Sequence, residues 1–338
     1  MGKRVPTIYT VADHAGVSIA TVSRVDRGHP SVADPTARRV RASMQSVGYR
    51  PNGAARALAM QRHGAIGLVF PQMSGPYYTG VIVGLEEAAA GLGQGVYIVG
   101  TQGRVRPEQL VTDLSRRVDG LVLTGRTVPD ELIAELQRQR LPVVLLARTA
   151  VGASDVVRTE NTRSAQRLTA HLIEHGHKTI AFIGDPDSSP DTAERWDGFL
   201  KAHRRARAGA PKSPELSALR ETEGRATATR LLGSRARPTA LFCANDEIAM
   251  GAYAAAAELG LKIPADVAVT GWDDIPVARF LNPGLTTVRQ PLTEIGAVAA
   301  RLLAERVNGS RRHASTTVLP TEIIIRSSCG CQPQGGIW

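Results

Sequence analysis

Apolar residues near the start of the chain recur at helical spacing in short runs. The first run, Ile8–Ala15, places its apolar side chains on one face of a helix. Thr7 precedes this run and can cap its first turn through the hydroxyl group. Gly16 follows it and can adopt the left-handed geometry that ends helices. The pattern therefore predicts a helix of about two turns with a defined beginning and end.

Two further runs complete a small helical unit. Ser18 is expected to cap a second helix, in which Val22 and Val25 point inward. A third helix is expected from Asp34-Pro35, because proline is tolerated in a first turn, to Gly48. Two short helices joined by a glycine turn and followed by a third helix are typical of a helix-turn-helix unit.

From residue 65 onward the pattern changes to continuous apolar runs that alternate with amphipathic segments. We expect strands in AIGLVFP (65–71), GVYIVGT (95–101), VDGLVLTG (118–125), LPVVLLA (141–147), TIAFIGD (179–185), TALFCAND (239–246) and VAVTGWDD (267–274). Helices are expected over 78–92, 108–117, 130–139 and 164–174. Strands of this kind form parallel sheets that are buried on both faces. They are too many for one compact sheet, so the sequence predicts two doubly wound lobes with a ligand cleft between them.

Composition narrows the class of protein. The chain has 338 residues, enough for two or three domains, and 43% of them are hydrophobic. No apolar run reaches the length of a membrane helix, and the first nine residues lack the apolar stretch of a secretory signal. We therefore expect a cytoplasmic protein without a membrane partner.

Positive charge is concentrated at the N-terminal end. Residues 1–62 contain ten basic and three acidic residues, which accounts for +7 of the net charge of +10. A small basic module beside a nearly balanced remainder indicates a polyanionic partner. The alternative is a solvated basic face on an ordinary domain.

Two signals could indicate an enzyme or a metal site. HLIEH (171–175) fits the zinc-protease pattern H-x-x-E-H, with two histidines on one helical face and His177 nearby. However, the segment ends at Gly176 and leads directly into a buried strand. The pair Cys329-Gly-Cys331 by itself lacks the further ligands that zinc needs. We therefore predict no metal, no cofactor and no catalytic set, and keep a zinc hydrolase as a minor alternative.

Several segments together resemble the lactose/galactose-repressor (LacI) family of bacterial transcription regulators. TIYTVADHAGVSIATVSRV (7–25) is close to the helix-turn-helix signature of that family, and GYRPNGAARAL (48–58) resembles its hinge. VDGLVL, HLIEHGHKTIAFIG, ERWDGF, CANDEIAMGA and GWDDIPVARFLNPGLTTVRQP follow in the family's usual order. The resemblance implies an all-α, lambda-repressor-like helix-turn-helix headpiece and an α/β core like that of periplasmic binding proteins.

The resemblance also implies a domain organisation. Residues 1–50 are expected to form the DNA-binding domain, 51–63 a hinge helix or linker, and 64–338 the effector-binding and dimerisation domain. Within the last, an N-lobe is expected over about 64–160 plus 290–325, and a C-lobe over about 161–289, with crossovers near Glu160 and Arg289. The hinge helix is too short to be stable alone and is expected to order on binding.

The second helix of a helix-turn-helix enters the major groove of DNA, so its first residues meet base edges. Ile19 and Ala20 occupy those positions and offer apolar contact, and Arg24 matches the two acceptors of a guanine edge. Candidate phosphate anchors are Tyr9, Ser18, Thr21 and Ser23, with capping or solvation as the alternative for each hydroxyl. Arg27 is a further candidate for DNA contact.

The hinge carries its own DNA-binding prediction. Asn52, Ala55 and Leu58 share one helical face. The resemblance implies that Leu58 wedges between base pairs in the minor groove and kinks the duplex. The alternative is that Leu58 packs on the core domain.

For the cleft, the resemblance implies a set of effector-binding residues. Arg195 and Asp273 are the charged pair, and a guanidinium with a carboxylate can bracket a diol by several hydrogen bonds. The alternative is a salt bridge, either between the two or with a local partner. The remaining candidates are Tyr77, Tyr78, Arg148, Asp191 and Asn245. Ala147 stands before Arg148 where many relatives carry Asp.

The sequence thus predicts a homodimeric repressor of a catabolic or uptake operon that binds a palindromic operator in double-stranded DNA. Its effector is expected to be a small molecule, a sugar or a related polyol or nucleoside. The alternatives are a sugar-binding protein without gene control and, less favoured, the zinc hydrolase.

Overall fold

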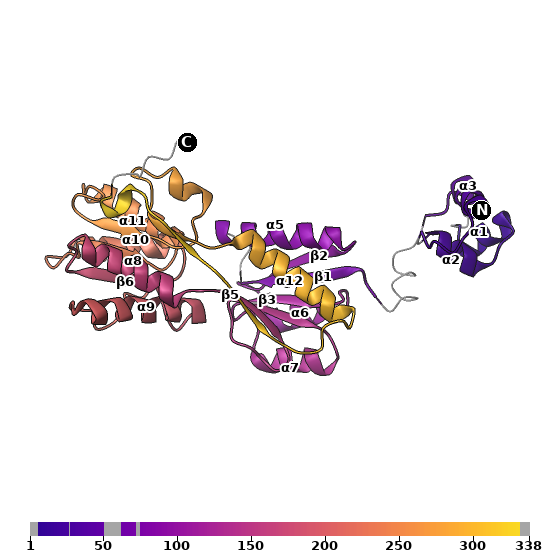
Figure 1. Cartoon of the computed structure of the whole chain (residues 1–338), viewed down its shortest axis with the longest axis horizontal. Helices are drawn as coiled ribbons and strands as arrows, with labels where there is room; N and C mark the ends of the chain where they lie inside the picture. Colours follow the sequence, from indigo (N-terminus) through magenta and orange to yellow (C-terminus); the bar gives the residue numbers. More distant parts are fainter. Residues whose placement is uncertain (1–5, 27, 51–61, 72–74, 332–338) are drawn as a thin grey trace. The chain divides into compact units, whose positions relative to one another are not determined.

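The computed structural model describes residues 6–26, 28–50, 62–71 and 75–331. The chain divides into two compact units, Met1–His63 and Gly64–Trp338, whose elements are labelled in Figure 1. Within the described ranges, no helix has both the length and the apolar character needed to cross a bilayer.

In its described residues the first unit contains three helices that pack on one another, as the apolar spacing predicts. They are α1 (Ile8–Ala15), α2 (Ile19–Asp26) and α3 (Asp34–Val47). One valine from each helix, Val11, Val22 and Val40, is fully buried in their shared core. Thr7 forms a capping box with Thr10. Gly16 and Gly48 end α1 and α3 with φ values of 63° and 67°, which favour glycine because a side chain would clash there.

The N-lobe of the second unit is built on a six-stranded parallel sheet in the order β10-β5-β4-β3-β1-β2. The strands are β1 (Ala65–Phe70), β2 (Gly95–Gly100), β3 (Leu121–Thr124), β4 (Val143–Leu146), β5 (Asp155–Thr159) and β10 (Thr316–Leu319). Helices α5 (Pro76–Gly91) and α12 (Leu292–Val307) share one apolar cluster with the sheet, and α6 (Pro107–Ser115) and α7 (Asp130–Arg138) share another. Burial of both faces explains why β1, β3 and β4 read as continuous apolar runs.

The C-lobe has a smaller parallel sheet in the order β6-β7-β8. Its strands are β6 (Ile180–Ile183), β7 (Ala240–Cys243) and β8 (Ala268–Thr270). Two helix pairs pack with this sheet, α8 (Thr162–Glu174) with α9 (Pro190–Ala206) and α10 (Glu221–Leu232) with α11 (Asp246–Glu258). The lobe is completed by η1 (Pro276–Arg279), an antiparallel pair of β9 (Thr287–Arg289) with β11 (Glu322–Ile324), and η2 (Ser327–Cys329).

The chain passes between the lobes at three neighbouring places, after β5, after β9 and after β10 (Figure 1). The first and third passages are joined by a hydrogen bond of 2.9 Å from the Glu160 amide to the Leu319 carbonyl. The first and second are joined by one of 2.6 Å from the Thr159 hydroxyl to Gln290 Oε1. These bonds hold the three passages side by side.

Helices α5 and α12 cross with their backbones in contact. A Cβ atom on Gly84 would lie 1.8 Å from the carbonyl oxygen of Thr293, and one on Gly296 would lie 2.1 Å from that of Val81. Since real Cβ atoms do not approach other atoms so closely, these two glycines permit the crossing.

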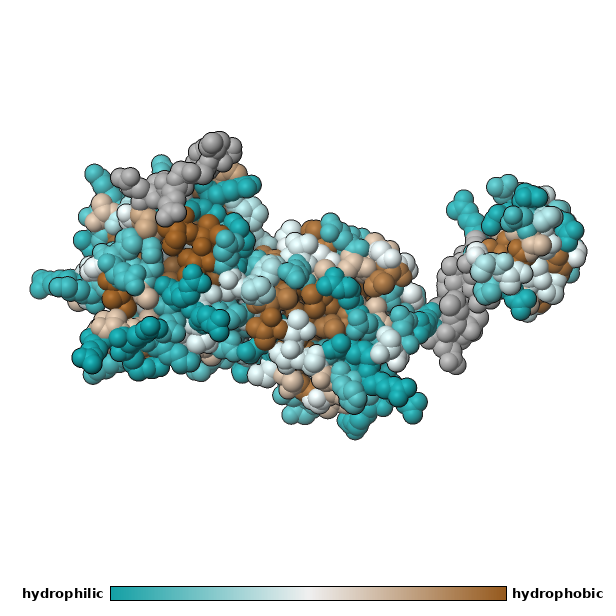
Figure 2. Space-filling model, in the orientation of Figure 1, coloured by the Kyte–Doolittle hydropathy of each residue, from teal (hydrophilic) through white to brown (hydrophobic). Residues whose placement is uncertain are grey.

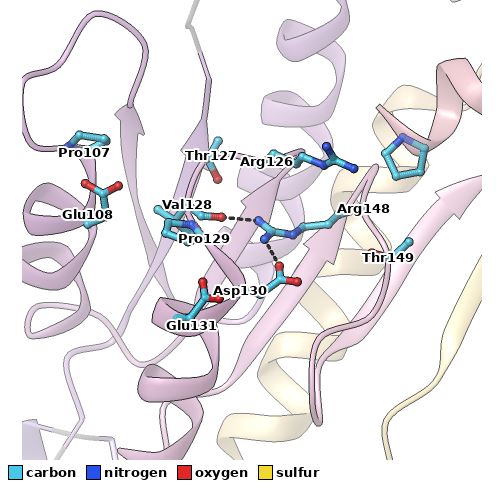
Figure 3. Close-up of a pocket in the computed structure, with 11 residues that line it drawn as sticks. Pro107, Glu108, Arg126, Thr127, Val128, Pro129, Asp130, Glu131, Arg148 and Thr149 are labelled. Atoms are coloured by element: carbon cyan, nitrogen blue, oxygen red, sulfur yellow. Dashed lines mark hydrogen bonds and ion pairs between the residues drawn. The ribbon is translucent and has the colours of Figure 1, made fainter. Parts of the chain in front are cut away.

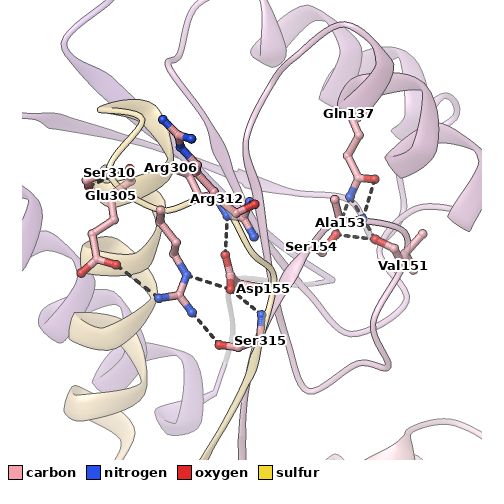
Figure 4. A network of polar contacts seen from close by, with 11 residues as sticks. Gln137, Val151, Ala153, Ser154, Asp155, Glu305, Arg306, Ser310, Arg312 and Ser315 are labelled. Carbon is pink, nitrogen blue, oxygen red and sulfur yellow. Dashed lines mark hydrogen bonds and ion pairs between the residues drawn. The ribbon is translucent and has the colours of Figure 1, made fainter.

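A buried carboxylate joins the start of β5 to the end of α12 and to the segment before β10 (Figure 4). Asp155, at the start of β5, is fully buried. It accepts hydrogen bonds from Nε of Arg306 at 2.7 Å, from Nε of Arg311 at 3.0 Å and from the Ser315 amide at 2.8 Å. Two cations and an amide compensate the desolvated charge, and they tie the end of α12 and the approach to β10 onto β5.

Candidate functional site

The surface of α2 presents the predicted base-reading residues to solvent. Ile19 has 41% of its surface exposed although it is a large apolar residue, and Ala20 and Arg24 are exposed beside it. The opposite face of the helix buries Val22 and Val25. The three side chains are therefore available to a partner and make no contribution to the headpiece core.

The predicted phosphate anchors differ in their surroundings. Tyr9 is 63% exposed, whereas Thr21 and Ser23 are half-buried. Ser18 caps α2 as expected, accepting a hydrogen bond of 3.2 Å from the Thr21 amide, and its Oγ lies 2.9 Å from Oγ1 of Thr21. While it caps the helix, the hydroxyl oxygen of Ser18 can still accept a second hydrogen bond. The candidates Arg27, Asn52, Ala55 and Leu58 lie outside the described residues.

In the second unit, Arg195 on α9 is buried and rigidly held. Its Nε donates to Asn161 Oδ1 at 2.9 Å and its Nη1 donates to the Ala244 carbonyl at 2.7 Å. The guanidinium carbon lies 4.5 Å from the centre of the Trp272 ring, a cation–π arrangement. A guanidinium has five N–H groups, and two of them are used in these bonds to described residues, which leaves three that could bind a ligand.

Asp273 follows Trp272 at the carboxyl end of β8 and is also buried. Its φ of 117° is strained for a residue with a side chain, and such strain is concentrated at functional sites. The carboxylate accepts a hydrogen bond of 2.6 Å from Gln290 Nε2, and Gln290 in turn accepts from Thr159. Asp273 is thereby linked to two passages between the lobes. Within the described residues, Arg195 and Asp273 form no ion pair with each other, contrary to the alternative considered above.

The electrostatics show that four predicted residues lie near one another. Burial raises the pKa of Asp273 to about 7, against the opposing effects of Arg195 and the Gln290 hydrogen bond. Burial also raises the pKa of Asp191, again opposed by Arg195. The pKa of Tyr77 is raised by burial and then by the charges of Asp191 and Asp273. The mutual charge effects and the shared burial are consistent with Tyr77, Asp191, Arg195 and Asp273 lying near one another in one low-dielectric region.

Tyr78 and Asn245 lie at the edge of this group. Burial raises the pKa of Tyr78 to about 12, with Glu247 and then Asp273 adding to the rise. The Tyr78 ring packs edge-on against that of Tyr77, with centroids 5.2 Å apart. Asn245 caps α11 by accepting from the Ile248 amide at 2.9 Å, and its Nδ2 donates to a carbonyl at 3.2 Å. One amide hydrogen of Asn245 remains for another partner.

Arg148 is engaged within the N-lobe (Figure 3). Its Nη1 donates to the carbonyls of Val128 at 2.8 Å and Gly125 at 3.1 Å, and its Nη2 pairs with Asp130. Arg148 lines a cavity of about 590 Å³, and Pro190 from the C-lobe is also part of its lining. Asp273 lines a different cavity, of about 830 Å³, between the start of α5 and the segments 273–276 and 289–294. The structure therefore does not bring Arg148 and Asp273 to the same cavity.

Sequence reasoning missed the residues that hold this site. Asn161 orients Arg195 and also donates to Asp191 at 3.2 Å, and Gln290 orients Asp273. Asn161 follows β5, at the carboxyl end of a parallel strand where ligand sites form. The apolar pattern does not predict β5 as a strand. The position of Asn161 at the end of a strand therefore could not be recognised from the sequence.

The raised pKa of Asp273 predicts a dependence of stability on pH. Between its ordinary value near 4 and the folded value of about 7, the folded chain binds more protons than the unfolded chain. Raising the pH across this window therefore favours unfolding. We expect Asp273→Asn to remove on the order of 4 kcal/mol of this dependence, because each pKa unit corresponds to about 1.4 kcal/mol, and urea unfolding at a series of pH values would measure it.

The matched control is Asp187→Asn, which removes an exposed carboxylate from the same lobe. It should leave the pH profile of the wild type unchanged. An equally steep profile for Asp273→Asn would contradict the raised pKa of Asp273.

A helix-turn-helix unit followed by a two-lobed α/β core defines a class of protein, the two-domain bacterial transcription regulators. The family model "Bacterial regulatory proteins, lacI family" matches residues 7–52, and the model "Periplasmic binding protein-like domain" matches residues 169–329. The chain belongs to the LacI family of bacterial transcription regulators.

Relatives resemble the chain over almost its full length. It is 32% identical over 329 residues to the HTH-type transcriptional repressor PurR of Pasteurella multocida, covering 95% of this chain and 98% of the relative. It is 33% identical over 332 residues to the PurR repressor of Haemophilus influenzae, with coverages of 95% and 98%. These relatives are repressors, so the chain is a transcription regulator and not an enzyme.

Solved structures agree with this assignment. The lac repressor dimer bound to operator and the anti-inducer ONPF has a TM-score of 0.85 at 26% identity, covering 96% of this chain and 99% of that one. The transcriptional regulator CelR in complex with cellobiose has a TM-score of 0.73 at 29% identity, covering 96% and 99%.

Proposed function

We propose that the chain is a homodimeric repressor that binds a palindromic operator and responds to a sugar bound between its lobes. The observation that carries the effector proposal is the state of Arg195. This guanidinium is buried and packs on Trp272, and among the described residues it uses two of its five N–H groups and forms no ion pair with the nearby carboxylates. Because a repressor must reach the DNA that it regulates, we place the protein in the cytoplasm.

The chemistry around Arg195 suits a polyhydroxylated ligand. A guanidinium donates to hydroxyl oxygens, while the carboxylates of Asp191 and Asp273 accept from hydroxyl hydrogens. Tyr77 adds an aromatic face, on which sugar C–H groups can pack. Related regulators with bound cellobiose and with bound ribose support this class of effector.

Coupling between ligand and DNA requires a ligand that favours one arrangement of the lobes. Asp273 is linked through Gln290 to Thr159, and these residues lie in two of the passages between the lobes. A ligand hydroxyl that competes for Asp273 would therefore act on the segments that bend when the lobes close. We infer that lobe closure carries the response.

A second copy of the chain is the partner we propose for the exposed apolar surface. Figure 2 shows apolar residues gathered over α12 of the N-lobe and beside α11 of the C-lobe. On other elements of the same unit, Val83 of α5, Tyr97 of β2 and Phe280 after η1 are large apolar residues with 43%, 51% and 71% of their surface exposed. A two-fold dimer would cover such surface and would match the symmetry of a palindromic operator.

The test is a nuclease footprint of the full chain on its own promoter region. We expect a protected site with two-fold sequence symmetry, and an affinity that falls at least about a hundredfold between low and physiological salt. Adding cellobiose, ribose or a ribonucleoside in turn then identifies the ligand that alters operator binding. A footprint without symmetry would contradict the repressor proposal, and a response to a nucleoside alone would contradict the sugar.

A further inference from the structure

Two segments that are far apart in the sequence meet on the C-lobe. His171 and His175 lie one turn apart near the end of α8, and their ring centroids are 4.2 Å apart. Cys329 and Cys331 come from η2 and the residues that follow it. Gly330 between them has a φ of 95°, which lets the chain turn so that both thiols approach the helix. In sequence, the histidine pair and the cysteine pair each lacked ligands; the fold joins them.

The donor atoms lie at distances close to those of a metal site. Nε2 of His175 is 3.0 Å from Sγ of Cys331, and Nε2 of His171 is 3.3 Å from Sγ of Cys329 and 3.5 Å from Sγ of Cys331. Zinc with bonds of about 2.0 Å to nitrogen and about 2.3 Å to sulfur places tetrahedral N and S ligands about 3.5 Å apart. His171, His175 and Cys331 keep their donor atoms within 4.8 Å of one another. Cys329 lies outside that group and contacts it through His171, so its thiol has to move toward the other donors to complete the tetrahedron.

Neighbouring groups orient these donors. Nδ1 of His175 lies 2.9 Å from the carbonyl oxygen of His171, so this nitrogen carries the proton and Nε2 presents its lone pair to the thiols. The Thr286 hydroxyl lies 3.2 Å from Sγ of Cys329. Cys329 is buried, whereas His175 is exposed, so the cluster is open to an entering ion on one side.

We propose that His171, His175, Cys329 and Cys331 form a Cys₂His₂ site for Zn²⁺. Imidazole and thiolate donors in a tetrahedral set favour Zn²⁺ over Mg²⁺ or Ca²⁺, which prefer oxygen. Four protein ligands leave no open position for a substrate, so the site is structural and supports no hydrolysis. Binding releases the two thiol protons to solvent and involves no change of oxidation state.

The consequence of binding is a clamp between the C-terminal segment and the C-lobe. Cys329 already packs in the core of that lobe, and the ion would add bonds from both thiols to α8. The repressor function does not depend on this site, so the two proposals can fail separately.

The test uses the reduced full-length chain and Co²⁺ as a spectroscopic probe. We expect one equivalent to bind, with the absorption bands of tetrahedral, thiolate-ligated cobalt, and to be displaced by Zn²⁺. Cys331→Ser and His175→Asn should each weaken binding at least about tenfold. Both residues lie partly or fully at the surface, so the fold is expected to survive, as circular dichroism would verify.

The matched control is His313→Asn, which removes an exposed imidazole from outside the cluster and should leave binding unchanged. A second readout is the alkylation of Cys329 and Cys331, which Zn²⁺ should suppress. Absence of stoichiometric Co²⁺ binding would overturn the proposal. So would undiminished binding by Cys331→Ser and His175→Asn, or oxidation of the two thiols to a disulfide at the same rate with and without Zn²⁺.

Discussion

Replacing Arg195 with alanine is expected to abolish the effector response while the chain still binds its operator. The substitution removes every hydrogen bond that the guanidinium could donate to the ligand in a buried site. Charge-assisted hydrogen bonds are worth about 1.5–3 kcal/mol each, so the loss of two should weaken ligand binding at least about a hundredfold. Isothermal titration of the ligand identified by the operator assay, and operator binding with and without it, would measure both effects.

Arg195→Lys separates charge from shape, because lysine keeps the cation but cannot supply the planar fork. We expect it to restore little of the response. Arg204→Ala is the matched control, since Arg204 lies on the same helix with an exposed side chain. Arg195 also supports the fold through Asn161 and Ala244, so thermal unfolding must show that the variant is folded. A folded Arg195→Ala chain with a normal response would contradict the proposed ligand site.

Replacing Arg24 with alanine is expected to weaken operator binding by about 10- to 100-fold. An arginine that donates two hydrogen bonds to a guanine edge contributes about 1–3 kcal/mol of discrimination between bases. Arg24 lies on the exposed face of α2, away from the buried valines, so the headpiece should fold without it. Competition binding with operator variants, changed one base pair at a time, would measure both the loss and the position that becomes tolerant.

Arg41→Ala on α3 provides the comparison, because Arg41 is also exposed in the headpiece but lies outside the reading helix. It is expected to leave the preference for each base pair unchanged, because a contact to phosphate carries no sequence information. Equal base preferences in the Arg24→Ala chain and the wild type would show that Arg24 does not read a base.

The helices of the headpiece could be predicted because their determinants are local. Thr7, Gly16 and Gly48 act on the turns next to them, and the apolar spacing reports burial within one helix. Central strands such as β1 and β4 could be recognised because burial on both faces makes their residues apolar throughout. The strands β5 and β10 could not be recognised from the apolar pattern. β5 carries a charged residue at its start, and β10 lies at the edge of the sheet, where it is largely solvent-exposed.

The sequence by itself determined the class of fold and the family, and it supplied the residues proposed to contact DNA and ligand, since periodicity, caps and motifs are read along one stretch of chain. The tertiary structure alone decided how distant side chains combine. It linked Asp273 through Gln290 to Thr159, placed Asp155 between Arg306 and Arg311, and brought His171 and His175 to two cysteines more than 150 residues away. Local sequence patterns report burial and secondary structure. These contacts instead depend on which distant segments of the chain the fold brings together.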